Sequence, residues 1–257
     1  MGELSGKHGL IVGVANKRSI AWSVAQAVSK AGARLALTYQ GERLGENVRD
    51  LAGTLDEALV LPCDVSLDAD IAAVYKQIER EFGGLDFILH AAAFAPREAL
   101  SEPFVQTERD AFRQALDVSA YSLVALARGA MPLMERQGGG SILALTYLGS
   151  ERVFPNYNVM GVAKAALEST VRYLASDLGP QNIRVNAISA GPIRTLAAAG
   201  ISGFRNILQL YRERAPLRRN VDAAEVADAA VFLLGSKGRA VTAEVLVVDA
   251  GYRAMGM

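Results

Sequence analysis

The sequence predicts a single doubly wound α/β domain. Short apolar runs alternate with longer segments of helical periodicity along all 257 residues, the pattern of a parallel sheet with right-handed crossovers and helices on both faces. The apolar runs are nearly continuous, as expected for strands that are buried on both faces. No linker, low-complexity block or solenoid-length repeat interrupts the chain. We therefore expect one Rossmann-type domain over residues 1–257, built on a seven-stranded parallel sheet.

The apolar runs place the seven strands. They are expected at residues 8–14, 34–39, 58–61, 85–90, 141–145, 183–188 and 245–248. Segments of helical periodicity occupy residues 20–31, 42–55, 67–82, 107–116, 118–137, about 156–179 and 223–234. Glycines mark several boundaries: Gly32 ends the first helix, Gly83 the third, and Gly138 to Gly140 precede the fifth strand. After the sixth strand we expect a loop with short helices up to residue 217, in which residues 194–217 are a candidate lid.

The composition excludes several classes of function. Lys plus Arg and Asp plus Glu number 27 each, so no net charge attracts nucleic acid or an anionic membrane. The single Cys63 rules out an internal disulfide framework and fits a reducing compartment. With only His8 and His90, and no cysteine–histidine cluster, we expect no metal site. There is no signal-peptide pattern and no uncharged run long enough to span a bilayer, so a soluble, cytoplasmic protein is expected.

The turn after the first strand, residues 13–21, is a candidate phosphate site. Backbone N–H groups and the dipole at a helix N-terminus favour an anion such as a pyrophosphate. Gly13, Ser19 and Ala21 are small enough for close approach, and Ser19 can cap the helix or donate its hydroxyl to phosphate. Because the usual G-x-G-x-x-G fingerprint is absent, an ordinary strand-to-helix connection is the alternative. The position at the start of a long βα alternation favours a dinucleotide.

The ends of the second and third strands are candidate contacts for the rest of a dinucleotide. A ribose-binding acidic residue is usual after the second strand, where this chain has Gln40, an uncharged hydrogen-bonding group. Arg43 nearby is able to attract a 2′-phosphate, so spacing leaves NAD and NADP open. Asp64 and Val65, after the third strand, are placed to bracket an adenine. The alternative for Asp64 is a helix N-cap.

Tyr157 and Lys164 are the leading catalytic candidates, because they follow the fifth strand at the sheet edge where ligands bind. They are seven residues apart, which is two turns of a helix beginning near residue 156 and about 10 Å of rise. That is too far for direct proton exchange, but both side chains can touch one bound molecule such as a ribose. The alternative is an ordinary pair on the surface of an amphipathic helix.

These motifs together resemble the short-chain dehydrogenase/reductases, and within them the divergent branch of enoyl-acyl carrier protein reductases of bacterial type II fatty acid synthesis. The resemblance covers nearly the whole chain. Residues 13–21 look like the modified glycine loop of that branch, and residues 147–163 and 186–196 look like it throughout. Tyr157 and Lys164 match its Tyr-x6-Lys pair, whereas the broader family uses Tyr-x3-Lys, a spacing at which this chain has Gly161.

The resemblance implies a reaction and its participants. Hydride would pass from NADH to C3 of a trans-2-enoyl-acyl carrier protein thioester and reduce its C2=C3 bond, the last step of the elongation cycle. Tyr157 would donate to the enolate oxygen, and Lys164 would hold the nicotinamide ribose and lower the pKa of the Tyr157 phenol. Tyr147, near the usual position of a catalytic serine, would line the acyl pocket, with packing as its alternative role. Gln40 matches the NADH-preferring members, and a homotetramer is implied.

The resemblance also implies which residues bind. The substrate would contact Ala95, Tyr147 and Tyr157. The cofactor would contact Gly13, Ser19, Ile20, Gln40, Asp64, Val65, Ala92, Lys164, Ile193, Arg194, Thr195, Leu196 and Ala197. One departure concerns the cofactor ribose, because Ala91, Ala92 and Ala93 stand where the family often has Ser-Ile-Gly.

Two features outside these motifs carry further expectations. Residues 194–219 contain Arg194, Arg205, Arg212, Arg214, Arg218 and Arg219 against only Glu213. This cluster suits the family's acidic acyl carrier, or it is a solvated helix face. His90 is interpreted as a hydrogen-bonded histidine at a strand end rather than an acid, and the C2 proton has no evident side-chain donor, which leaves water.

Two other functions are alternatives. A ketone or pteridine reductase on this scaffold predicts Tyr-x3-Lys and a serine near position 147, and both are missing. A nucleotide-binding regulator without turnover does not require Tyr147, Tyr157 and Lys164 together.

Overall fold

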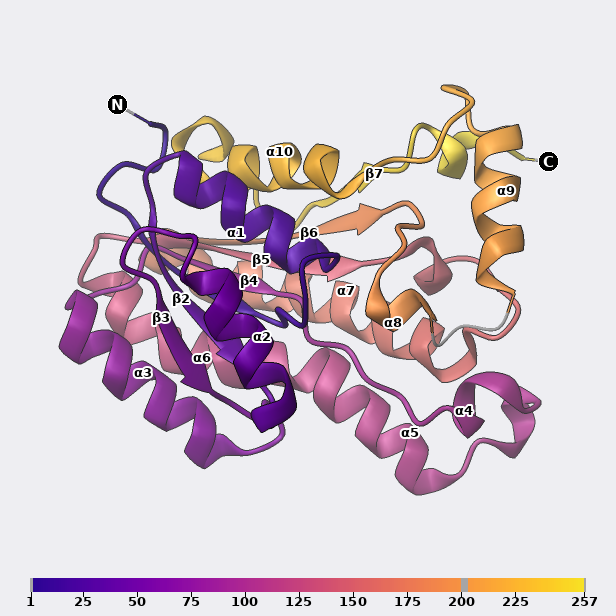
Figure 1. Ribbon diagram of the computed structural model, residues 1–257, viewed down its shortest axis with the longest axis horizontal. Coiled ribbons are helices and arrows are strands. Elements are labelled where there is room, and N and C mark those ends of the chain that lie inside the picture. Colours follow the sequence, from indigo (N-terminus) through magenta and orange to yellow (C-terminus); the bar gives the residue numbers. More distant parts are fainter. Residues whose placement is uncertain (1, 200–202, 257) are drawn as a thin grey trace.

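The chain folds around a seven-stranded sheet in the order β3-β2-β1-β4-β5-β6-β7, in which every neighbouring pair is parallel. The computed structural model describes residues 2–199 and 203–256, without the side chains of Ala197 and Ala199. Helices cover both faces of the sheet (Figure 1). The doubly wound, Rossmann-type fold predicted from the sequence is confirmed.

Each of the seven predicted strands is present. They are β1 (His8–Val12), β2 (Arg34–Tyr39), β3 (Leu59–Pro62), β4 (Phe87–His90), β5 (Gly140–Thr146), β6 (Ile183–Ala190) and β7 (Val245–Val248). Successive residues of a strand face opposite sides of a sheet, and here both sides are covered. Leu10 and Ile11 of β1, for example, are each fully buried but belong to different apolar clusters. This explains the unbroken apolar runs in the sequence.

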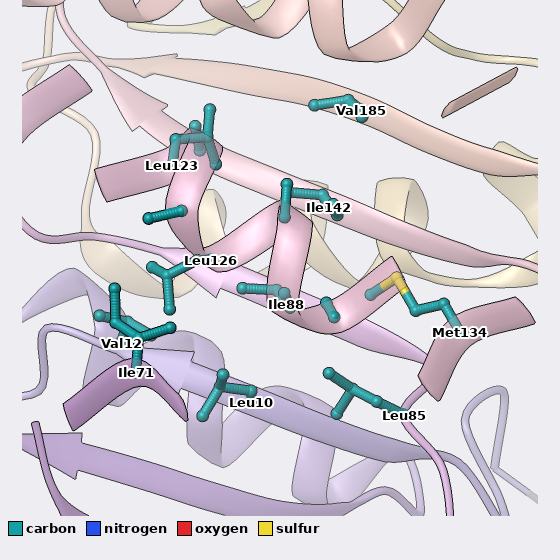
Figure 2. Packing of buried hydrophobic residues seen from close by; sticks show 14 of the residues in the cluster. Leu10, Val12, Ile71, Leu85, Ile88, Leu123, Leu126, Met134, Ile142 and Val185 are labelled. Carbon is teal, nitrogen blue, oxygen red and sulfur yellow. The ribbon is translucent and has the colours of Figure 1, made fainter. Parts of the chain in front are cut away.

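The helices form one layer on each face. One layer consists of α1 (Ile20–Lys30), α2 (Glu42–Ala52) and α10 (Ala223–Leu234); the other consists of α3 (Asp68–Phe82), α6 (Ser122–Glu135) and α7 (Asn158–Leu178). Figure 2 shows the second layer, where Leu123 and Leu126 of α6 lie over Ile88 of β4 and Ile142 of β5. Burying such side chains completely contributes about 1.5–3 kcal/mol each.

Four further helices gather at one end of the sheet. They are α4 (Glu98–Ser101), α5 (Arg109–Leu116), α8 (Leu196–Ala199) and α9 (Phe204–Arg214), and Figure 1 shows them beyond the ends of the strand arrows. In a parallel sheet all the carboxyl ends of the strands meet at this edge. The strand order reverses at β1, which pairs with β2 on one side and β4 on the other. Ligands bind at such a switch point.

Some predicted boundaries are wrong, for local reasons. The first strand ends at Val12 rather than at residue 14, because Gly13 turns the backbone to φ 99°. The predicted helix over residues 118–137 begins with a π-helical turn at Asp117–Tyr121 before α6. The short helices predicted before residue 217 include α9, which has 11 residues. Residues 200–202 of the candidate lid lie outside the described part of the chain.

Candidate active site

A cavity of about 490 Å³ opens at the carboxyl edge of the sheet. We call it the central cavity. Most of the predicted site residues line it: Gly13, Ser19, Ile20, Ala95, Tyr147, Tyr157, Lys164, Ile193, Thr195 and Leu196. The loops after β1, β4, β5 and β6 supply them, so segments far apart in the sequence meet at one site.

The other predicted cofactor contacts lie around the central cavity. Gln40 and Asp64 line a neighbouring hollow, which shares Phe94 with the central cavity. Val65 and Ala92 pack partly buried against the core, and in this loop it is Ala91 and Ala93 that line the central cavity. Arg194 is exposed. Ala197 lies in α8, but its side chain is outside the described part of the chain.

Gly13 lets the loop after β1 approach the loop after β4. Its φ is 99°, and a Cβ at this position would lie 2.6 Å from the carbonyl oxygen of Ala91. Ser19 occupies the N-cap position of α1, but its side chain makes no capping bond; its hydroxyl donates instead to the Asn16 carbonyl at 2.6 Å. The predicted side-chain cap is therefore wrong. The first turn of α1 keeps unpaired N–H groups beside the cavity, where they can bind phosphate oxygens.

Gln40 and Asp64 form a joined pair in the neighbouring hollow. The Gln40 Nε2 donates to Asp64 Oδ2 at 2.8 Å, and Asp64 Oδ1 accepts from the backbone N and the hydroxyl of Ser66 at 2.9 and 2.7 Å. Burial raises the pKa of Asp64, but the hydrogen bonds from Ser66 and Gln40 outweigh it and hold that pKa below its usual value. The alternative role of Asp64 as an N-cap is wrong, because Leu67 precedes α3.

Tyr157 precedes α7 rather than lying on it. The helix begins at Asn158, Tyr157 is its N-cap residue, and the flanking Asn156 and Asn158 have φ of 60° and 35°. Asparagine is one of the few residues that adopts this region readily. The prediction that Tyr157 and Lys164 share one helix face is therefore wrong: a turn presents Tyr157 and the helix presents Lys164.

Two glycines make room for the Tyr157 ring. A Cβ on Gly149 would lie 2.4 Å from this ring, and a Cβ on Gly161 would lie 2.7 Å from the Gly149 carbonyl oxygen. Gly161 is the position at which the shorter Tyr-x3-Lys spacing would place a lysine. The structure has no room for a side chain there, so only the longer spacing is compatible with this packing.

An aromatic cluster packs against the Tyr157 ring. The Tyr147 ring meets the Tyr157 ring edge-on at 5.1 Å and lies 5.1 Å from Phe154. Burial raises the pKa of Tyr157 well above its usual value, and the nearby Tyr147 and Glu168 raise it further. The expected lowering of this pKa by Lys164 is thus wrong. Among the described residues the Tyr157 hydroxyl has no hydrogen-bond partner, so it is a neutral donor facing the cavity.

Lys164 is fixed against the end of β5. Its Nζ donates to the Leu145 carbonyl at 2.7 Å, and the residue is only 7% exposed. Burial lowers its pKa to about 8, and the carboxylate of Glu168 opposes that change. At neutral pH the side chain is therefore mainly an ammonium that lines the cavity with two donors to spare.

Tyr211 was not singled out from the sequence. It lies on α9, is 1% exposed, stacks on Tyr252 with the ring centres 3.6 Å apart, and shares a long hydroxyl contact of 3.4 Å with Tyr147. The cavity also receives Phe204 and Ile207 from α9. The only sequence signal was an apolar face in a segment already expected to be a lid, and that signal does not reveal contact with Tyr147.

Only one of the two ring nitrogens of His90 has a hydrogen-bond partner among the described residues. His90 is fully buried, its Nε2 lies 2.7 Å from the Ser122 hydroxyl, and its Nδ1 has no partner in the described part of the chain. Burial lowers the pKa of His90 to about 3, and Lys164 contributes. The ring is therefore neutral and does not act as an acid.

Two structural features are missing from the described residues. These residues contain no group of three or more His, Cys, Asp or Glu side chains arranged to hold a metal ion. Within the same residues, no helix has the length and apolarity that a membrane crossing requires.

Comparison with known proteins gives a consistent result. The sequence profile of the family "Enoyl-(Acyl carrier protein) reductase" matches residues 13–253. An enoyl-[acyl-carrier-protein] reductase [NADH] of Bacillus cereus is 54% identical over 255 residues, covering 98% of this chain and 99% of the relative. A Rhizobium meliloti enzyme of the same description is 51% identical over 256 residues, covering 100% and 93%.

Solved structures agree over the full length. The B. cereus enoyl-acyl carrier protein reductase with NADP+ and indole naphthyridinone superposes with a TM-score of 0.97 at 54% identity, covering 100% of both chains. The Anaplasma phagocytophilum enzyme in complex with NAD has a TM-score of 0.95 at 48% identity, covering 100% of this chain and 97% of the other.

Proposed function

Because this chain belongs to the enoyl-acyl carrier protein reductase family, we propose that the central cavity is its active site. The protein is an NADH-dependent reductase of the C2=C3 bond in trans-2-enoyl-acyl carrier protein thioesters, the last step of fatty acid elongation. One observation supports the choice of site. The unpaired Tyr157 hydroxyl and the Lys164 ammonium line one cavity together with the first turn of α1.

The cavity and the neighbouring hollow fit a nicotinamide dinucleotide. The approach of Gly13 to Ala91 leaves a loop without side-chain bulk beside the N-terminus of α1, where a pyrophosphate would bind. The Gln40–Asp64 pair would receive the adenosine end. Thr195 and Ile193 line the same cavity as Lys164 and would approach the carboxamide. When bound, NADH supplies the hydride that reaches C3 of the acyl chain.

Tyr157 would stabilise the charge that develops on the thioester oxygen. Because its pKa is raised, its hydroxyl remains protonated and donates a hydrogen bond throughout the neutral range. A donor aimed at a developing oxyanion in a dry site is among the largest single contributions to catalysis. The Tyr157 ring packs closely against Gly149 and meets Tyr147 edge-on. These contacts fix the ring, so the hydroxyl needs little reorganisation in the transition state.

Lys164 would hold the nicotinamide ribose. One of its three N–H donors is used by the Leu145 carbonyl, which leaves two for ribose hydroxyls. Tyr147 would line the acyl pocket beside the thioester, together with Ala95. Its pKa is raised, chiefly by burial, so it too stays neutral. Tyr147 thus positions the substrate and Lys164 the cofactor, and the two side chains do not exchange protons with each other.

The arginine surface, defined as Arg194, Arg205, Arg212, Arg214, Arg218 and Arg219, is a docking site for the acidic acyl carrier in this proposal. Arg219 is engaged with Glu225 of α10 at 2.7 Å, and Arg218 bonds to the Glu213 carbonyl oxygen. The remaining four are exposed and have no ion pair among the described residues. They lie on and beside α8 and α9, at the same edge of the sheet as the cavity (Figure 1).

A homotetrameric, cytoplasmic enzyme remains part of the proposal, with residues 194–217 as its lid. Exposed Phe112 on α5 and Tyr121 in the π-helical turn offer apolar surface for assembly with further copies. The contact of Tyr211 with Tyr147 and the position of Ile207 in the cavity lining support the lid.

Replacing Tyr157 by Phe should lower kcat by about a hundredfold or more, because one oxyanion donor is lost. Lys164→Ala should lower kcat and also raise the Kd of NADH. Steady-state kinetics and NADH titration check both. Tyr173→Phe is the matched control, a phenol on α7 that is 74% exposed, and should behave like the parent. Unchanged kinetics in both the Tyr157 and Lys164 variants would contradict the assignment.

Cofactor choice should depend on the Gln40–Asp64 pair. The Asp64 carboxylate would repel the 2′-phosphate of a cofactor bound in this hollow, so the parent enzyme should use NADH with a higher kcat/KM than NADPH. Gln40→Arg should raise kcat/KM for NADPH relative to NADH by about tenfold or more, as expected when a guanidinium replaces an amide beside a phosphate. Arg172→Ala, at an exposed arginine on α7, is the control and should leave the ratio unchanged. A ratio indifferent to Gln40→Arg would remove this role.

Salt should separate docking of the carrier from binding of the acyl chain. The KM for carrier-bound substrate should rise with ionic strength, whereas the KM for a small free enoyl thioester should not. Arg205→Ala combined with Arg212→Ala should raise only the first KM, severalfold. Arg136→Ala, at an arginine paired with Glu79, is the control. Equal salt dependence of the two substrates would contradict the docking proposal.

A further inference from the structure

Glu168 is a buried carboxylate for which the proposed mechanism has no use. It lies on α7 and is 8% exposed, and its Oε1 accepts a 2.6 Å hydrogen bond from the hydroxyl of Thr146, the last residue of β5. A carboxylate removed from water is costly unless an opposite charge and hydrogen bonds compensate. The Thr146 hydroxyl is neutral and supplies only one bond. The compensating charge must therefore come from elsewhere.

Lys164, one turn earlier on the same helix, carries an opposite charge that interacts electrostatically with Glu168. Residues four apart lie on one face of a helix, and Lys164 is as deeply buried as Glu168. The two side chains engage consecutive residues of β5: Lys164 Nζ donates to the Leu145 carbonyl at 2.7 Å, and Glu168 accepts from Thr146. Two opposite charges on successive turns are thus fixed to the same end of one strand.

The other titratable groups near Lys164 carry no charge that could replace Glu168. His90, from β4, is neutral because burial lowers its pKa to about 3. The phenols of Tyr147 and Tyr157 are neutral because burial raises their pKa values. Within the described residues, Glu168 is the one negative charge that acts on the Lys164 ammonium, and it raises the lysine pKa against the effect of burial.

We propose that Glu168 is a positioning residue that keeps Lys164 protonated, so that its ammonium is available to the nicotinamide ribose at neutral and mildly alkaline pH. This inference rests on the ribose-binding role proposed for Lys164. The direction follows from the sign of the charge. A lysine binds the ribose as an ammonium below its pKa and loses that contribution as the pH rises through the pKa. Removing Glu168 lowers that pKa, so the loss begins at a lower pH.

A merely structural Glu168 would act differently. The Thr146–Glu168 bond also fastens α7 to β5, and losing it would lower the melting temperature. It would not move the pH at which NADH affinity falls. The pH profile of NADH binding therefore separates an effect of the Glu168 charge from an effect of the Thr146–Glu168 hydrogen bond on stability.

The experiment measures the Kd of NADH by fluorescence titration at pH values on both sides of the Lys164 pKa of about 8. Glu168→Gln removes the charge but keeps an oxygen for Thr146. Glu168→Met is a second neutral variant of similar length in case the first fails to fold, and Glu168→Asp restores the charge. Asp177→Asn removes an exposed carboxylate from the same helix and is the matched control.

The midpoint above which NADH affinity falls should move down by about one pH unit in Glu168→Gln and Glu168→Met. It should stay near the parent value in Asp177→Asn and largely return in Glu168→Asp. Well below the midpoint, the neutral variants should bind NADH nearly as the parent does. A lower melting temperature with an unmoved midpoint would overturn the proposal and leave Glu168 a structural residue.

The Lys164→Ala variant distinguishes failure of the Glu168 proposal from failure of the ribose-binding role proposed for Lys164. It should weaken NADH binding below the parent's midpoint and abolish the midpoint itself. If Lys164→Ala binds NADH like the parent, the ribose role of Lys164 is wrong and the proposal for Glu168 falls with it. If Lys164→Ala behaves as expected but the Glu168 variants keep the parent midpoint, only the proposal for Glu168 is wrong.

Discussion

The junction between β5 and α7 is the contact on which the site depends. β5 ends at Thr146, and the chain returns as α7 so closely that Lys164 bonds to the Leu145 carbonyl and Glu168 to the Thr146 hydroxyl. The loop between them therefore has little freedom, and it carries both Tyr147 and Tyr157. Fixing these groups before substrate binds avoids reorganisation in the transition state, which is where preorganised electrostatic groups are most effective.

Burial divides the electrostatic roles in this site. It raises the pKa of the Tyr147 and Tyr157 phenols, which remain neutral hydrogen-bond donors. The same burial lowers the pKa of Lys164 to about 8, close enough to neutrality for one carboxylate to matter. A dry cavity thus favours a neutral donor at the substrate oxygen and makes the lysine charge dependent on its surroundings. The long Tyr-x6-Lys spacing separates these groups, which do not share a proton.

The strands and most helices were predictable because a parallel sheet buried on both faces requires unbroken apolar runs. Details that depend on the direction of individual side chains were not predictable. Ser19 stands at the N-cap position, as predicted, but its hydroxyl turns to Asn16. Tyr157 stands before the helix because Asn156 and Asn158 adopt positive φ, which the helical pattern concealed. The pairing of Glu168 with Thr146, 22 residues away, leaves no local pattern at all.

The direct test of the account is the fate of the hydride. With NADH deuterated at both C4 positions of the nicotinamide and a trans-2-enoyl thioester, the account predicts one deuterium at C3 of the saturated acyl product and none at C2, by mass spectrometry. The rate of this transfer should fall sharply in Tyr157→Phe. A saturated product without deuterium, or deuterium transferred to the thioester carbonyl carbon, would contradict it.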